Sequence, residues 1–219
     1  MAKPFRRLRK QFAAQGWRLL FSFDTTVEPG SIVEIRSARD LNNLSSIFKY
    51  PAARDVAVLG PADVGLLDFT RAHQLSLDAA AQLLGGTGLK PKLRNVKTAT
   101  LSLDRPMKWY IEDKIELFST LAGDPDWPAS PYAKRLTMKR HYLVTEVVKT
   151  KLRYTFHGEG DVALTAEATG LRSLRSVKLD TAYKWDNQYE LIAKAPLVIA
   201  YEAVQWRPRK GIFRTLKAG

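Results

Sequence analysis

The segment 141–169 constrains the fold of this chain more than any other, because apolar and polar residues alternate along it. Successive side chains of a β-strand point to opposite faces, so a period of two predicts one apolar and one polar face. The apolar face comprises Tyr142, Val144, Val148, Leu152, Tyr154 and Phe156, with interruptions at Glu146 and Thr150. The polar face comprises Thr145, Lys149, Lys151, Arg153, Thr155 and His157. We therefore expect a long amphipathic strand over residues 141–157.

A second alternating run follows at 161–169, after the turn sequence Gly158-Glu159-Gly160. Its apolar positions are Val162, Leu164, Ala166 and Ala168. The two runs are about as long as, or longer than, the roughly 9–11 residues of a transmembrane β-strand. Alternation alone is more typical of a half-buried hairpin in a soluble sheet. The cations of the polar face favour a membrane hairpin, because neighbouring like charges require water or anionic headgroups beside them.

The charge of the chain predicts an anionic partner. Lys and Arg number 35 against 22 Asp and Glu, which gives a net charge of +13. Such a surplus is typical of proteins that bind nucleic acid, an acidic membrane surface or an acidic domain. No apolar run approaches the roughly 20 residues of a spanning helix, and no signal-peptide core follows the basic start. We expect a protein that is soluble and cytoplasmic when it is made.

Motifs for catalysis or metal binding are absent from the sequence. The chain contains no cysteine, which excludes disulfides, thiolate zinc sites and thiol nucleophiles. Its histidines, His73, His141 and His157, lie in no HExxH or HxE spacing, and no GxSxG elbow occurs. The glycine-rich segment 85–90 follows a predicted helix and lacks the spacing of a phosphate-binding loop. We therefore expect a protein that is not an enzyme and needs no metal or other cofactor.

Elsewhere the sequence predicts strands and helices in mixed order. Runs rich in β-branched and aromatic residues predict strands at 17–23, 31–36, 92–103, 189–193 and 197–206. Helical spacing of apolar residues predicts helices at 4–15, 76–84 and 111–122. Three prolines predict a rigid loop at 124–131, and residues 40–70 predict loops and short pieces. The fold class is α+β, because too few βαβ units occur for a parallel sheet.

The predicted helix 4–15 is amphipathic and basic. Phe5, Leu8 and Phe12 lie at helical spacing on one face. The cations on the rest of its surface are Arg6, Arg7, Arg9 and Lys10. Such a helix packs on the core as a solvated element or rests on an acidic membrane, where each basic residue contributes about 1 kcal/mol. The two arrangements are compatible, and we expect these cations to bind the membrane surface.

Several segments resemble motifs of the gasdermin family. Residues 141–150, HYLVTEVVKT, are similar to the gasdermin strand YVVTEVL-x-T, and residues 195–206, APLVIAYEAVQW, are similar to G-x-V-[LI]-A-[YF]-x-V-x-Q-L. Near the start, residues 12–20 and 27–33 resemble the opening of bacterial members, a GY-x-L strand followed by a P-G-D-[VI]-[LV] strand. The resemblance spreads over most of the chain and is weakest from 40 to 109.

The resemblance implies a twisted, mostly antiparallel sheet with peripheral helices, able to extend two amphipathic hairpins into a membrane β-barrel. It implies a pore-forming domain over residues 1–206, followed by a short basic tail at 207–219. A caspase-like protease would release the domain from inhibition, and the domain would assemble into a large ring on an acidic inner membrane. In bacteria this kills the infected cell in antiphage defence. The second hairpin would span 143–179, and the first would come from the region preceding and including 92–103.

Two departures from the family and one alternative function remain. Many bacterial members carry an acylated cysteine near the N-terminus, and this chain has none, so we expect no lipidated residue. Either the short basic tail 207–219 is the whole inhibitory element, or the inhibitory segment has been removed or never existed. The alternative function is a basic nucleic-acid-binding module, favoured by the charge, by Trp17 and Phe21 beside Arg18, and by the basic run 207–210.

Overall fold

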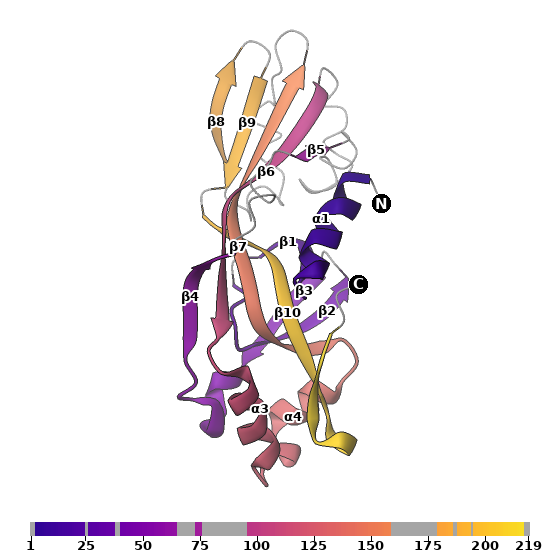
Figure 1. The fold of residues 1–219 in the computed structure, drawn as a ribbon, viewed down its shortest axis with the longest axis vertical. Coiled ribbons are helices and arrows are strands. Elements are labelled where there is room, and N and C mark those ends of the chain that lie inside the picture. Colours follow the sequence, from indigo (N-terminus) through magenta and orange to yellow (C-terminus); the bar gives the residue numbers. More distant parts are fainter. Residues whose placement is uncertain are drawn as a thin grey trace. The chain divides into compact units, whose positions relative to one another are not determined.

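The computed structural model describes residues 3–24, 26–37, 40–64, 73–75, 96–158, 179–185, 188–193 and 195–216. The chain forms two compact units, each built from segments that are distant in the sequence. Unit 1 combines Met1–Gln11, Gly65–Pro106 and Lys149–Leu197. Unit 2 combines Phe12–Val64, Met107–Val148 and Val198–Gly219. The class is α+β, with a mostly antiparallel sheet and a few helices, as predicted (Figure 1).

Unit 2 is built on a sheet with the strand order β1-β10-β7-β2-β3. These strands are β1 (Arg18–Asp24), β10 (Leu197–Arg207), β7 (His141–Gly158), β2 (Ser31–Ser37) and β3 (Asp40–Ser46). The short strand β11 (Ile212–Thr215) pairs antiparallel with the end of β10, and β4 (Val58–Asp63) pairs antiparallel with β6 (Val96–Ile111). The turn before β2 has Gly30 at a φ of 88°, a conformation that favours glycine.

Among the described residues, β7 contributes to two hydrophobic clusters of unit 2. Leu143 belongs to a cluster around Trp127, and Val144 to a cluster with Val33 and Val198. Because β7 lies between β10 and β2, Leu143, Val144, Thr145, Val147 and Val148 are all buried. The alternation predicted over 141–157 therefore begins only at Lys149. A strand in the interior of a sheet with packing on both faces has no solvent-facing side.

The described residues include three α-helices, and two of them differ from the sequence prediction. The first, α1 (Lys3–Ala14), matches the predicted helix 4–15. The second, α3 (Lys114–Gly123), begins after the predicted start, because Ile111 ends β6 and Asp113 caps the helix by accepting the Glu116 N–H at 2.7 Å. The third, α4 (Pro131–Thr137), was not predicted. Pro131 occupies the first helical turn, where proline is tolerated, and the Ser130 hydroxyl caps the helix.

Some of the paired strands in unit 1 are not consecutive in the sequence. The end of β7 pairs antiparallel with β9 (Gln188–Ala193), which pairs in turn with β8 (Leu179–Trp185). The first half of β6 pairs antiparallel with β5 (His73–Leu75). The predicted helix at 76–84 and the predicted return strand at 161–169, with Val162, Leu164 and Ala166, lie outside the described residues.

A hydrogen bond between Tyr50 and Asp124 ties two distant segments of unit 2 together. The Tyr50 hydroxyl donates to Asp124 Oδ2 at 2.7 Å, and Asp124 Oδ1 accepts the Asp126 N–H at 2.9 Å. The Tyr50 bond holds the pKa of the Asp124 carboxyl below its usual range. Burial, reinforced by the bond to Asp124, raises the pKa of Tyr50 to about 12.

Replacing Tyr50 by Phe is expected to lower the free energy of unfolding at neutral pH and to have less effect in acid. A carboxyl whose pKa is depressed by folding stabilises the protein above its unfolded pKa, and this contribution is lost as the pH falls through the folded pKa. The difference between wild type and Tyr50→Phe should therefore shrink below about pH 4. It should persist to pH 10, because Tyr50 stays protonated until the pH approaches about 12. Urea unfolding across pH checks this, and a difference that is constant from pH 2 to 7 would contradict it.

Candidate functional site

The second half of β7 presents one buried apolar face and one exposed polar face in unit 1. Leu152, Tyr154 and Phe156 are 3%, 1% and 0% exposed. Lys151, Arg153 and His157 alternate with them and are exposed, and Lys149 is half-buried. The other predicted apolar positions lie in the part of β7 within unit 2, where Val144 and Val148 are buried and Tyr142 is half-buried.

Both residues that interrupt the apolar face have local structural explanations. Thr150 is buried, and its hydroxyl donates to the Asp104 carbonyl oxygen at 2.7 Å. Glu146 accepts a hydrogen bond from the Trp17 indole N–H at 2.7 Å, within unit 2. Trp17 is itself only 5% exposed, so its ring is not available to stack on a nucleic-acid base.

The polar face of β7 carries a carboxylate from its partner strand. Arg153 pairs in register with Ile192, and Thr155 pairs with Glu190. The Glu190 carboxylate lies 3.3 Å from Arg153 Nη1 and accepts a hydrogen bond from the Thr155 hydroxyl at 3.3 Å. This exposed ion pair offsets part of the repulsion among the cations of β7 and contributes little to stability.

Strand β6 repeats the amphipathic pattern of β7 within unit 1. Ala99, Leu101 and Leu103 are buried, whereas Thr98, Thr100 and Ser102 between them are half-buried. This alternation lies in the region 92–103, to which the gasdermin resemblance assigns part of the first hairpin. The strand continues beyond its predicted end at residue 103 to Ile111.

The basic helix α1 is anchored at its C-terminal end. Phe12 is fully buried, and its ring lies 6.2 Å from the ring of Trp17 in unit 2. Arg9 is half-buried and Lys10 is exposed. Arg6 and Arg7 fall within the helix, but their side chains, like those of Phe5 and Leu8, lie outside the described part of the structure.

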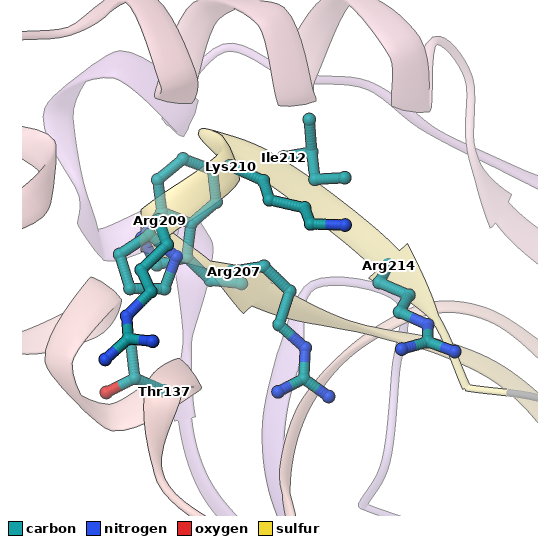
Figure 2. Close-up of a pocket in the computed structure, with 8 residues that line it drawn as sticks. Thr137, Arg207, Arg209, Lys210, Ile212 and Arg214 are labelled. Carbon is teal, nitrogen blue, oxygen red and sulfur yellow. The ribbon is translucent and has the colours of Figure 1, made fainter.

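A cationic cavity in unit 2 was not predicted as a site. It lies at the β10–β11 hairpin, has a volume of about 860 Å³ and is shown in Figure 2. Its lining residues are Thr137, Trp206, Arg207, Pro208, Arg209, Lys210, Ile212 and Arg214. The sequence contains all of these cations in the basic tail, but only the pairing of β11 with β10 brings Arg214 next to Arg207.

Replacing Tyr154 by Phe is expected to stabilise the folded protein. The Tyr154 hydroxyl is buried and has no hydrogen-bond partner within the described ranges. Removing an unsatisfied buried hydroxyl while keeping the ring avoids a desolvation cost of about 1–3 kcal/mol. The midpoint of urea unfolding should therefore rise for Tyr154→Phe and fall for the control Phe156→Ala, which deletes a buried ring. A lower midpoint for Tyr154→Phe would show that the hydroxyl has a partner.

The described residues include neither a membrane-spanning helix nor a metal-binding cluster. None of the helices in this part of the chain is both long and apolar enough to span a membrane. No cluster of three or more histidine, cysteine, aspartate or glutamate side chains in this part of the chain has the geometry to hold a metal ion.

Comparison with known proteins identifies the architecture. No protein-family model matches the sequence, and no curated protein matches it significantly. Among solved structures, a bacterial gasdermin from Bradyrhizobium tropiciagri is similar over 94% of this chain and 89% of its own, with a TM-score of 0.59 and 16% sequence identity. The similarity covers both units, and at this identity it is the fold that it establishes. The chain has the gasdermin fold.

Proposed function

We propose that this protein forms membrane pores, by inserting amphipathic β-hairpins built on β6 and β7. The observation that carries the proposal is the alternation of buried side chains with exposed or half-buried ones along both strands in unit 1, within a gasdermin fold. The second hairpin spans 143–179, from within β7 to the start of β8. The first is built on the region that includes β6.

Insertion would move the apolar face of β7 from the protein core into lipid. Leu152, Tyr154 and Phe156 are buried in the core of unit 1 and would face lipid after insertion. Lipid tails are as apolar as a protein core, so these side chains lose little in the transfer. Lys149, Lys151 and Arg153 would face the water-filled interior, and hairpin pairing would satisfy the backbone groups that lipid cannot.

We propose an acidic membrane as the target, because the net charge of +13 attracts anionic headgroups. The cations of α1, namely Arg6, Arg7, Arg9 and Lys10, bind its surface, and several copies of the chain assemble into a ring. A caspase-like protease releases the protein from an inhibited form in the cytoplasm. The resulting pore in the cell membrane executes cell death in antiphage defence.

The experiment that tests this proposal is dye release from liposomes. Purified protein, before and after limited proteolysis, is added to phosphatidylcholine liposomes with or without phosphatidylserine. We expect rapid release restricted to the anionic liposomes, and ring-shaped oligomers on them by electron microscopy. Stimulation by proteolysis would support the inhibited form. Folded protein that releases no dye under any of these conditions would refute pore formation.

A further inference from the structure

The β10–β11 hairpin has a turn that is well defined by its sequence. Pro208 begins a single 3-10 turn, Pro208–Lys210, where its missing N–H and fixed φ are tolerated. Gly211 follows with a φ of 60°, a left-handed conformation that favours glycine, and its N–H donates to the Pro208 carbonyl oxygen at 3.2 Å. Pro208 and Gly211 fix the turn, and the turn fixes the backbone positions of Arg207 and Arg209.

The register of the hairpin places two arginines on one face. Arg207 pairs with Ile212 and Gln205 pairs with Arg214. Directly opposite residues share a face, as do residues two apart on one strand, so Arg207 and Arg214 are diagonal neighbours. Trp206 and Phe213 pair on the opposite face, where their rings lie 4.9 Å apart in the core of unit 2. Packing of that face holds the arginine face toward solvent.

The turn adds further cations to the same cavity. Arg209 and Lys210 lie in the 3-10 turn and line the cavity together with Arg207 and Arg214. Figure 2 shows the guanidinium groups of Arg207, Arg209 and Arg214 extending toward the same side of the hairpin. No carboxylate lines the cavity, and none of the four cations forms an ion pair with another described residue. Water screens the repulsion among these exposed cations, and an anion bound beside them would lower it further.

We infer that this cavity binds a multiply charged phosphate group. Guanidinium groups donate paired hydrogen bonds that match the oxygens of a phosphate, and three of them line this cavity. The volume of about 860 Å³ lies within the range of small-ligand sites. The phosphate comes from an anionic lipid headgroup or from a soluble phosphate compound. The site lies in unit 2, away from the insertion strands of unit 1 in sequence, and its existence does not depend on pore formation.

The test compares two variants that each remove two positive charges. The cavity variant is R207Q/R209Q. The control is R54Q/K139Q, which removes exposed cations of unit 2 that do not line the cavity. Inorganic pyrophosphate binding is measured by titration calorimetry, and binding to phosphatidylcholine vesicles containing phosphatidic acid is measured by co-flotation. Both are binding assays, so a protein that forms no pores still reports on the site. Circular dichroism verifies that each variant is folded.

We expect R207Q/R209Q to weaken binding about tenfold or more, and the control to bind nearly as tightly as wild type. If R207Q/R209Q weakens only pyrophosphate binding, the ligand is a soluble phosphate. If it weakens only vesicle binding, the ligand is a lipid headgroup. Equal losses in the two variants, or no binding of either probe by wild type, would overturn the site. Tight binding of a single-stranded oligonucleotide that pyrophosphate does not displace would also overturn it, in favour of a nucleic-acid surface.

Discussion

Leu152→Asp is expected to abolish pore formation, lowering the initial rate of dye release from anionic liposomes at least about tenfold. Leu152 lies on the apolar face of β7 that we propose contacts lipid, and it is 3% exposed in the folded protein. An aspartate in the middle of a membrane costs about 3 kcal/mol of insertion free energy for each subunit. Because every subunit of a ring contributes a copy, the cost is repeated around the pore.

The matched control is Leu152→Ala, because both substitutions remove the same buried side chain. The loss of a buried leucine costs about 2–5 kcal/mol of stability when alanine replaces it. Aspartate costs more in the folded protein, because its carboxylate would be buried without a partner, so circular dichroism must show that both variants are folded. Leu152→Ala keeps the position apolar and should retain most of the release activity, provided circular dichroism shows that it is folded. A second control, Lys151→Asp, places the same new charge on the exposed polar face and should leave release largely intact. If Leu152→Ala and Leu152→Asp lose activity equally, Leu152 acts through stability of unit 1 and not through lipid contact.

Trp127→Ala is expected to destabilise unit 2 by about 3–5 kcal/mol, which is a large fraction of the stability of a typical domain. Trp127 is fully buried at the centre of the cluster between the sheet and the helices. Its ring lies 5.3 Å from that of Tyr50 and 6.0 Å from those of Trp206 and Phe213. Alanine would leave a cavity among these rings and remove contacts that hold β11 on β10.

Trp127→Phe serves as the control, because it keeps an aromatic ring in the cluster. The Trp127 indole N–H has no hydrogen-bond partner among the residues that the structure describes. Replacement by phenylalanine therefore reduces the volume of the ring but removes no hydrogen bond. We expect a clearly smaller loss for Trp127→Phe, with both variants measured by guanidinium unfolding followed by circular dichroism. A midpoint for Trp127→Ala equal to that of wild type would show that the cluster does not stabilise the fold.

Local pattern in the sequence predicts much of the fold. The residues of α1, β1, β2, β7, β9 and β10 match the predicted segments to within a few positions. Each of these segments combines a clear period or an apolar run with a glycine or proline at or near a boundary, so the information lies in the local sequence. The three prolines of 124–131 predict a loop, whereas Pro131 occupies the first turn of α4, where proline is tolerated. Ile111 was assigned to a helix because its apolar side chain fits either period.

The sequence by itself determined the amphipathic faces of β7 from Lys149 onward, since a period of two needs no partner to be recognised. Tertiary structure decided which strand pairs with β7, the burial of β7 on both faces before Lys149, and the bond from Tyr50 to Asp124. It also decided that Arg214 joins Arg207 at one cavity. Which distant strands pair depends on how their buried surfaces fit together in the folded protein. The residue pattern within one segment contains no information about the surface of its partner.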